Sequence, residues 1–458
     1  MYPKLINLYL FSVFQHYLSR MGLGEEVKPG TLLLTEQPFV YVLTSKYRTE
    51  YCDFCFAKSE LRKCASCHYV YYCGRSCQKD GWSIHKHECN NLKRISPRII
   101  PDAARLLSRI LKKLAKGGSE IKSYYTKTKY RKFKDLMSHY TNIKDDINRI
   151  EHFQSLCGVL NDFLGTDFIP NPIELMGMYG RMCVNSFNIC DEELKSLGTG
   201  IYLAASIIDH SCQPTAVATF QGTRLNIRAT ETMPCLNWDK VFVSYIDTLY
   251  KPEARQKELM ATYYFMCQCP KCLDPLEPIH MSAAACSNPH CDSLVEIRDY
   301  DQVSNCDQCD SPISRQFKQL YKDVTEFTDV HLQNMKLAYL DVCKVCLNRH
   351  KGVLHNLNIQ HVRILDSAFE SSIDFGQWDD AKIFGISLIA GYRKYLGDTH
   401  PLLGILYLKL AKILIYQENI QDGKQYLHNA CKIIKITHGE DSNLYRSEIA
   451  SLIQNCMY

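Results

Sequence analysis

Hydrophobic and polar positions divide the first part of the chain into short strand-like runs. Between residues 22 and 43, the runs TLLL and FVYVL follow the turn Lys28-Pro29-Gly30. Because Pro-Gly between β-rich runs is typical of a turn, we expect short strands here. The earlier apolar run Leu5–Phe14 is too short to cross a membrane, and no small-residue cleavage site follows it. We therefore expect it to form a buried opening strand or helix rather than a signal peptide.

The pattern becomes helical from about residue 91 to 165. The segment ARLLSRILKKLAK places apolar residues at helical spacing, with lysines on the opposite face. The stretch is rich in Lys and Arg up to Lys134, which favours a solvated helix surface over a nucleic-acid face. Phe168 to Met178 contains prolines and predicts a bend followed by the start of a helix.

Strand-like runs return between residues 184 and 250. AVATF and LNIRA flank the turn Gln221-Gly222, and VFVSY follows. From about residue 315 onward, the pattern is helical throughout. There the segment Tyr395–Pro401 is echoed by Ile436–Ser442, with the two glycines about 42 residues apart. This period predicts helix pairs that resemble long tetratricopeptide repeats, with a plain helical bundle as the alternative.

Composition sets the broad class of the protein. The 458 residues are enough for two or three domains, and the net charge of +5 is too small to indicate nucleic-acid binding. Of the 23 cysteines, about fifteen fall into groups with metal-ligand spacing. That usage indicates a reducing compartment, so we expect cytoplasm and nucleus. No apolar run reaches the roughly twenty residues of a membrane span, and we expect no membrane association.

Eight potential metal ligands are interleaved within a stretch of about forty residues. They are Cys52, Cys55, Cys64, Cys67, Cys73, Cys77, His85 and Cys89. Each close pair supplies half of a tetrahedral zinc site, and four pairs make two closed sites. We expect cross-bracing, with Cys52, Cys55, Cys73 and Cys77 in one site and the others in the second. Disulfides or scattered core thiols are the alternative.

This pattern resembles the MYND zinc finger. The residues that carry the likeness are CDFCFAKSELRKCASCHYVYYCGRSCQKDGWSIHKHEC, with the Tyr-Tyr-Cys step and the closing Gln-Lys-Asp-x-Trp-x-x-His. The resemblance implies protein binding, usually of short proline-containing segments, rather than base reading. Direct DNA binding is not expected.

A second constellation begins at Asp209-His210-Ser211-Cys212. Val243-Ser244-Tyr245-Ile246-Asp247 follows about thirty residues later, and then come Tyr263, Phe265 and three cysteines. Cys267, Cys269 and Cys272 need a fourth ligand, and Cys212 is the nearby candidate. A third zinc would then hold the cysteine-rich tail against the Asp209–Cys212 loop.

This constellation resembles a SET-domain lysine methyltransferase with post-SET cysteines. With an inserted MYND finger, the chain is similar to the SMYD family of split SET proteins. The resemblance implies methyl transfer from S-adenosylmethionine to lysine in histone or non-histone proteins. It implies that Tyr245, Tyr263 and Phe187 line the lysine channel, with Tyr245 supplying the key hydroxyl. The implied cofactor contacts are Arg20, Met21, Gly22, His139, Asn185, Asp209, His210, Tyr263 and Phe265.

Three positions depart from the family pattern. Arg20 replaces the first glycine of the cofactor loop, Asp209 replaces an asparagine, and Leu236–Lys240 replaces an acidic turn. A scaffold or co-repressor of low or no activity, which binds partners through the finger and the C-terminal helices, is therefore the alternative function. Core packing is the alternative role for the three aromatic residues, and a surface position is the alternative for His139.

A further cysteine group could form a four-thiolate zinc ribbon. Its members are Cys286, Cys291, Cys306 and Cys309. Cys343 and Cys346 are also closely spaced, but they lie in a helical run without a second pair. We expect those two to be buried core thiols.

The resulting expectation is an α+β monomer. A β-rich SET core is split by the finger and a helical insert, and a cysteine-rich post-SET segment and an all-helical TPR-like C-terminal domain follow. The expected parts are residues 1–48 for the first SET segment, 49–90 for the finger, 91–178 for the insert, 179–250 for the catalytic core, 251–314 for the post-SET segment and 315–458 for the helical domain. The substrate lysine and the degree of methylation are not encoded in readable form.

Overall fold

The computed structural model describes residues 25–297, 299–300, 302–334 and 339–455. Leu5–Phe14 and the expected cofactor residues Arg20, Met21 and Gly22 lie outside them. The chain divides into two compact units. The first holds residues up to Asp209 together with 215–242 and 261–264, and the second holds 210–214, 243–260 and 265 onward. Three elements run across the division: β9 (Asp209–His210), β12 (Phe242–Val243) and α8 (Pro252–Tyr263).

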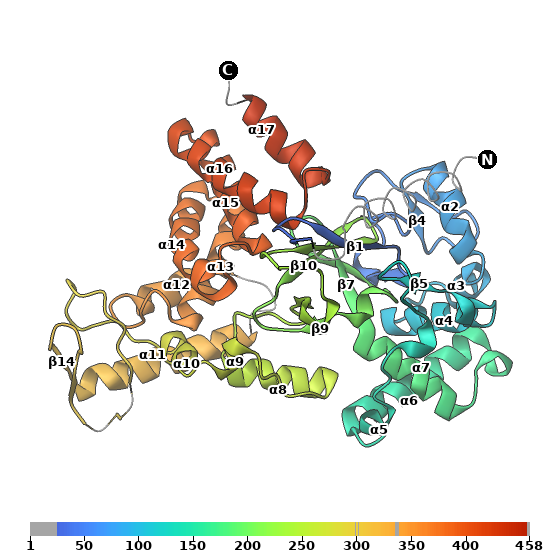
Figure 1. Cartoon of the computed structure of the whole chain (residues 1–458), viewed down its shortest axis with the longest axis horizontal. Helices are drawn as coiled ribbons and strands as arrows, with labels where there is room; N and C mark the ends of the chain where they lie inside the picture. The colour runs from blue at the N-terminus through green and yellow to red at the C-terminus, as the bar shows by residue number, and fades with distance from the viewer. Residues whose placement is uncertain (1–24, 298, 301, 335–338, 456–458) are drawn as a thin grey trace. The chain divides into compact units, whose positions relative to one another are not determined.

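Two antiparallel sheets form the β part of the first unit (Figure 1). One has the order β1 (Leu32–Glu36), β11 (Arg224–Ala229), β10 (Ala216–Gln221), and the other has the order β2 (Val40–Leu43), β8 (Ser196–Ile201), β7 (Ser186–Cys190). Each sheet pairs one strand from before the finger with two from the region after residue 184. The strands predicted in those two regions are therefore confirmed, although residues far apart in sequence build each sheet.

The remaining elements of the first unit are mainly helical. The helices are α2 (Arg75–His85), α3 (Cys89–Ile95), α4 (Asp102–Leu114), α5 (Tyr140–Ile143), α6 (Ile147–Leu164) and α7 (Pro172–Asn185). Two small hairpins join β3 (Arg62–Lys63) to β4 (Tyr71–Tyr72) and β5 (Ser123–Tyr124) to β6 (Tyr130–Arg131). Short 3₁₀ turns are η1 (Ser45–Tyr47), η2 (Gly118–Glu120), η3 (Phe133–Asp135), η4 (Thr166–Phe168), η5 (Ala205–Ile207) and η6 (Trp238–Lys240).

Helix α4 corrects one interpretation of the sequence. Its apolar face is buried as expected, with Leu107 and Ile110 fully covered. Arg105 and Arg109 are also buried, with 2% and 6% of their surface exposed, so the basic segment is not simply a solvated face. Burying a guanidinium is costly unless a carboxylate pairs with it, and both arginines have such partners in the finger.

The second unit is helical after residue 315, as predicted. Its helices are α9 (Pro270–Leu273), α10 (Leu276–Met281), α11 (Arg315–Asn334), α12 (Leu340–His350), α13 (Ile359–Asp374), α14 (Trp378–Leu396), α15 (Pro401–Tyr416), α16 (Ile420–Thr437) and α17 (Ala450–Asn455). A π-helical turn, η7 (Leu444–Ile449), precedes α17, and a hairpin joins β13 (Ser304–Asn305) to β14 (Pro312–Ile313). None of the described helices is long and apolar enough to cross a membrane.

Consecutive helices from α13 to α16 lie side by side and share one apolar core (Figure 1). The two glycines of the predicted repeat each follow a helix. Gly397 comes directly after α14 with φ 92°, and Gly439 lies two residues after α16 with φ 87°. These left-handed angles favour glycine, which is why the spacing of the two glycines marks the spacing of the helix ends.

Candidate functional site

The first thiol cluster of the finger brings together Cys52, Cys55, Cys73 and Cys77. Their sulfur atoms all lie within 4.8 Å of one another. Cys55 Sγ is 3.7 Å from Cys73 Sγ, which in turn is 3.4 Å from Cys77 Sγ. Zinc–sulfur bonds of about 2.3 Å at tetrahedral angles separate ligand sulfurs by about 3.8 Å, whereas a disulfide needs about 2.05 Å. The cluster therefore has the dimensions of a zinc site.

The second cluster of the finger contains Cys64, Cys67, His85 and Cys89. Cys64 Sγ lies 3.9 Å from Cys89 Sγ, and His85 Nε2 lies 3.4 Å from Cys67 Sγ. The other ring nitrogen of His85 faces Glu88 Oε1 at 3.5 Å. A carboxylate behind a ligating imidazole fixes the orientation of the ring and the nitrogen that meets the metal. The two clusters are the cross-braced sets expected from the spacing.

Four buried charges join the finger to α4. Arg105 Nη1 lies 2.7 Å from Asp53 Oδ1, and Arg105 Nη2 lies 2.6 Å from Glu88 Oε1. Arg109 Nη2 also approaches both carboxylates, at 2.6 Å from Glu88 Oε1 and 3.2 Å from Asp53 Oδ2. Burial pushes the pKa of Glu88 upward, but the two guanidinium groups hold it well below its usual range. Two carboxylates and two guanidiniums make the group neutral.

Sequence reasoning missed this charged cluster. Its signals were present, since Asp53 follows Cys52, Glu88 precedes Cys89, and the two arginines are four residues apart on one helix face. The cluster ties both zinc-ligand sets to the core of the first unit.

A third cluster, in the second unit, joins Cys212 to Cys267, Cys269 and Cys272. Cys212 Sγ lies 3.5 Å from Cys272 Sγ. The structure thus places the expected fourth thiol beside the cysteine-rich tail.

Arg255 supports this third cluster from α8. It is fully buried, donates to Glu277 Oε1 at 2.7 Å and lies 3.7 Å from Cys272 Sγ. A cation beside a sulfur ligand stabilises the thiolate form that zinc requires.

His210 links the third cluster to Tyr245. The backbone N–H of Tyr245 donates to His210 Nδ1 at 3.0 Å, and His210 Nε2 lies 3.3 Å from Cys212 Sγ. Because Nδ1 accepts a hydrogen bond, the ring proton sits on Nε2 and the imidazole is neutral. Burial lowers the pKa of His210 to about 4, in agreement with a neutral ring. The rings of His210 and Tyr245 lie 5.3 Å apart, and Phe265 contacts the same imidazole at 5.9 Å.

A fourth cluster forms where the ribbon was considered. Cys286 Sγ lies 3.5 Å from Cys309 Sγ, and Cys291 Sγ lies 3.9 Å from Cys306 Sγ. The backbone N–H of Asn288 points at Cys286 Sγ at 3.4 Å, as in the tight turns that hold zinc-binding thiols. Cys343 and Cys346 lie fully buried in α12, within the apolar core of the helices.

Phe187 lies in β7 of the first unit, opposite Gly200 of β8. Its ring meets that of Tyr202 edge-on, with centroids 5.6 Å apart. Tyr202 is fully buried and donates its hydroxyl to Thr223 O at 2.5 Å. Phe187 itself remains half-buried. Gly200 has no side chain to cover Phe187, and the hydrogen-bonded Tyr202 packs against the Phe187 ring.

His139 meets an aromatic residue that sequence reasoning did not assign. The ring of Tyr264 lies 5.4 Å from that of His139, and its hydroxyl donates to Asp146 Oδ2 at 3.0 Å. Both residues have left-handed backbones, with φ 46° for His139 and 63° for Tyr264. Such angles are unfavourable for residues other than glycine and often occur at functional sites. Tyr263, the predicted channel residue, is the last residue of α8.

Asn185 and Asp209, two of the expected cofactor contacts, each offer an oxygen acceptor in the first unit. Asn185 Nδ2 donates to Met137 O at 2.8 Å and to Arg181 O at 2.9 Å, so the amide is held by its nitrogen and presents its oxygen as an acceptor. Asp209 is exposed. An amide oxygen and a free carboxylate suit the ammonium group of S-adenosylmethionine.

Glu36 supports the chain just before Asp209. Its carboxylate accepts from the backbone N–H of Ala204 at 3.0 Å and of Ala205 at 2.9 Å, and from Ser123 Oγ at 2.5 Å. Burial raises the pKa of Glu36, while these hydrogen bonds lower it. Sequence reasoning assigned it no role because nothing in the run TLLLTE distinguishes it.

Comparison with known proteins gives the relationships of the whole chain. Residues 52–89 match the family described as MYND finger. The chain is 26% identical over 437 residues to mouse histone-lysine N-methyltransferase SMYD3, covering 94% of this chain and 93% of that protein. It is 29% identical over 424 residues to Xenopus laevis N-lysine methyltransferase SMYD2-A, covering 92% of each. It is 26% identical to Arabidopsis thaliana histone-lysine N-methyltransferase ASHR1, covering 91% of this chain and 88% of that protein.

Proposed function

We propose that this chain, which belongs to the SMYD family, transfers methyl groups from S-adenosylmethionine to lysine side chains of histone or other proteins. The observation that carries this function is the similarity to lysine methyltransferases along more than nine-tenths of the chain. Within it, a thiol cluster and His210 fix the backbone of Tyr245.

The family plan gives the fold its finer description. We propose that the two sheets and the segments around them form a SET core split by the finger and by α4–α7. The helices after residue 315 would form the TPR-like domain, and their exposed faces would bind protein partners.

The fit of the cofactor rests on the donor set described above. By resemblance to the family, the described residues that would contact it are Asn185, Asp209, His139, His210, Tyr263 and Phe265. S-adenosylmethionine supplies an electrophilic methyl group when bound.

The chain's own residues would prepare the lysine. Phe187, Tyr245 and Tyr263 line the proposed lysine channel. Aromatic walls exclude water, which favours the neutral amine, and they can hold the cationic form against a ring face. The hydroxyl of Tyr245 would orient the amine, and no general base beyond solvent is needed once the amine is neutral.

Zinc is proposed to be structural in all four clusters. Each has four protein ligands and no open coordination position. We therefore propose four zinc ions per chain: two in the finger, one beside Tyr245 and one in the ribbon formed by Cys286, Cys291, Cys306 and Cys309. The first three follow the family plan. Total zinc in the purified protein should be four per chain, and Cys306→Ser should lower it by one.

Partners and compartment follow from the same relationship. The finger is proposed to bind proline-containing segments, and the chain to act in cytoplasm and nucleus as a monomer. A scaffold without catalysis remains the second candidate, because Arg20 and Asp209 differ from the family's cofactor residues.

Calorimetric titration of the zinc-loaded protein with S-adenosylmethionine tests this function first. Micromolar binding, followed by transfer of labelled methyl from the cofactor to histones or a peptide library, supports the methyltransferase. A folded sample with full zinc content and no cofactor binding would favour the scaffold.

A further inference from the structure

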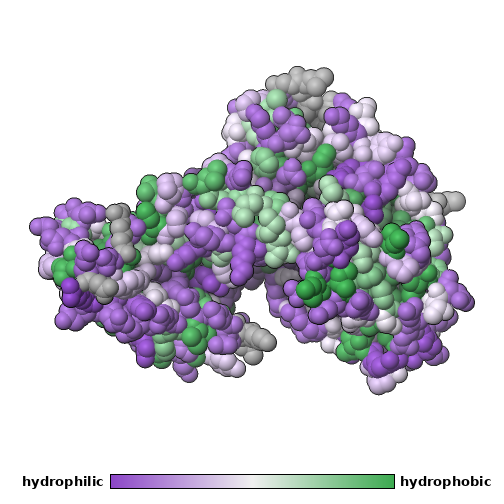
Figure 2. All heavy atoms as spheres, turned by 90° about the horizontal axis from the view of Figure 1, so that it is seen from below, coloured by the Kyte–Doolittle hydropathy of each residue, from purple (hydrophilic) through white to green (hydrophobic). Residues whose placement is uncertain are grey.

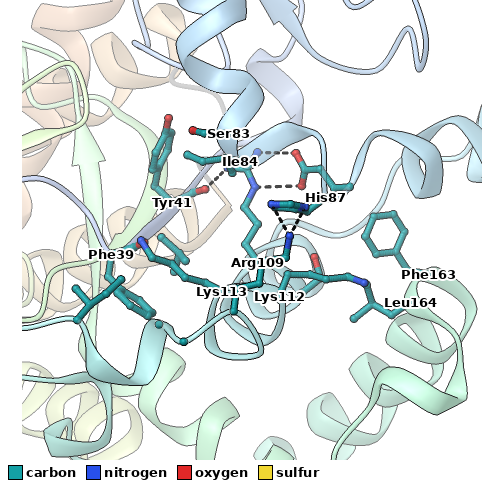
Figure 3. A pocket seen from close by; sticks show the side chains of 17 residues that line it. Phe39, Tyr41, Ser83, Ile84, His87, Arg109, Lys112, Lys113, Phe163 and Leu164 are labelled. Atoms are coloured by element: carbon teal, nitrogen blue, oxygen red, sulfur yellow. Dashed lines mark hydrogen bonds and ion pairs between the residues drawn. The ribbon is translucent and has the colours of Figure 1, made fainter. Parts of the chain in front are cut away.

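On the face shown in Figure 2, hydrophobic residues form small groups separated by hydrophilic ones. A cavity of about 390 Å³ in the first unit is a better candidate for a binding site (Figure 3). It lies between the finger and α4, and its lining includes none of the residues proposed above for methyl transfer.

The walls of this cavity are mostly apolar and come from four segments. Phe39 and Val40 contribute from β2 and the residue before it, Ile84 from α2, Ile121 from the residue after η2, and Phe163 and Leu164 from the end of α6. Figure 3 shows Phe163 and Leu164 on one side and Phe39 on the other. Cavities of this volume and lining suit a small organic molecule.

Three lysines give the cavity its charge: two lie in the last turn of α4, and the third lies two residues beyond its end. Lys112, Lys113 and Lys116 line it, and among the described residues none of them forms an ion pair with a carboxylate. The acidic lining residue Glu88 is already paired with Arg105 and Arg109. The lining therefore keeps an excess of about three positive charges. The like charges of these lysines, all of which line one cavity, repel each other.

The three ammonium groups have polar or aromatic partners, but none of these partners carries a negative charge. Lys113 Nζ donates to Phe39 O, Lys116 Nζ lies 2.9 Å from ring nitrogens of His87, and Lys112 Nζ lies 3.6 Å from the ring centre of Phe168. Burial lowers the pKa of Lys113 to about 8. An anion in the cavity would offset both the burial of Lys113 and the repulsion among the lysines.

We infer that this cavity binds a small amphipathic anion, consisting of an apolar body that carries one carboxylate. The apolar walls accommodate the body, and Lys113 and Lys116 meet the carboxylate. The C-terminal end of α4 carries a partial negative charge that opposes any anion here, and it opposes a doubly charged phosphate more than a singly charged carboxylate.

The test uses the zinc-loaded full chain with two probes of the same shape, 4-phenylbutyrate and its neutral amide. Ligand-observed NMR should show saturable binding of the carboxylate and at least about tenfold weaker binding of the amide, as expected for loss of a charge-assisted contact. Lys113→Gln and Lys116→Gln should each weaken carboxylate binding by about tenfold. Hydrogen exchange in α2 should slow when the carboxylate is bound, since Ser83 and Ile84 of α2 line the cavity.

Lys93→Gln is the matched control, because Lys93 is exposed on α3 and does not line the cavity. It should leave binding unchanged, and zinc content should show that all three variants fold. Equal binding of acid and amide, absence of saturable binding, or unchanged affinity in both lysine variants would overturn the assignment.

Discussion

The finger and the helices α13–α16 are held together by different forces. In the finger, seven cysteines, one histidine and a charged cluster occupy positions that apolar side chains would fill in a larger core. In the helices, Leu365, Leu388 and Leu410 are almost fully buried in a continuous apolar core. About forty residues cannot bury enough surface to fold alone, whereas a stack of long helices can. The difference teaches that metal and paired charges provide stability where chain length does not.

Removal of zinc should have the largest effect on the difference in stability between the finger and α13–α16. Structural zinc contributes about 10–16 kcal/mol to the folding of small domains. A chelator should therefore unfold the finger while α13–α16 stay folded. Hydrogen exchange read by mass spectrometry should show loss of protection in residues 52–95 and retained protection in 359–437. Equal loss in both regions would show that the helices also depend on metal.

The buried charges should have the next largest effect. Arg105→Met leaves Asp53 and Glu88 with one guanidinium between them, which should cost about 3–5 kcal/mol. The loss should appear as faster exchange in the finger and weaker zinc retention. Arg94→Met, which removes a half-exposed arginine paired with Asp162, should cost less than about 1 kcal/mol. Similar effects of the two substitutions would argue against a role for the cluster.

The apolar helices should respond to loss of volume instead. Leu410→Ala removes a fully buried side chain of α15 and should cost about 2–5 kcal/mol. In the chelated protein, urea denaturation should show the free energy of unfolding of the helices reduced by this amount. The zinc affinity of the protein without chelator should not change. Leu402→Ala, at a partly buried position on the same helix, is the control and should cost less.

A single partly buried carboxylate, Asp366, should have the smallest effect. Burial, with Glu370 and Asp247 nearby, raises the pKa of Asp366 to about 6 from 3.8, while the hydrogen bond from Tyr392 and the charge of Lys409 oppose the rise. The carboxyl of Asp366 therefore contributes fully to the stability of the helices below pH 3.8. This contribution is lost as the pH rises through 6. Asp366→Asn should stabilise the helices by about 1–2 kcal/mol at pH 7.5, and by less at pH 5. A urea midpoint that rises equally at both values would contradict this account.

The sequence predicted the finger well because its ligands are close together. The spacing of Cys52 to Cys89 already contained the grouping that the structure shows. Helical periodicity likewise predicted the region after residue 315, because the pattern of an amphipathic helix is visible within a short stretch of sequence. Even Cys212 could be assigned to its distant cluster, because three of the four ligands are adjacent in the chain.

Long-range polar contacts could not be predicted in this way. Arg105 and Arg109 resembled surface residues of a basic helix until Asp53 and Glu88 were placed beside them. His210 was expected only as a cofactor contact, but its side chain bridges Cys212 and Tyr245. Such pairings join segments that meet only in the folded chain, so the local signals mark the charged residues without saying which partners they take.

Methyl transfer by the wild-type protein and by Tyr245→Phe tests the central claim most directly. Both proteins should hold the same zinc content and bind S-adenosylmethionine with similar affinity. The wild type should transfer labelled methyl to lysine, and Tyr245→Phe should be at least about a hundredfold slower, as expected when a group that orients the reacting amine is lost. Cofactor binding without methyl transfer to any histone or peptide substrate, or equal rates for the two proteins, would contradict the account.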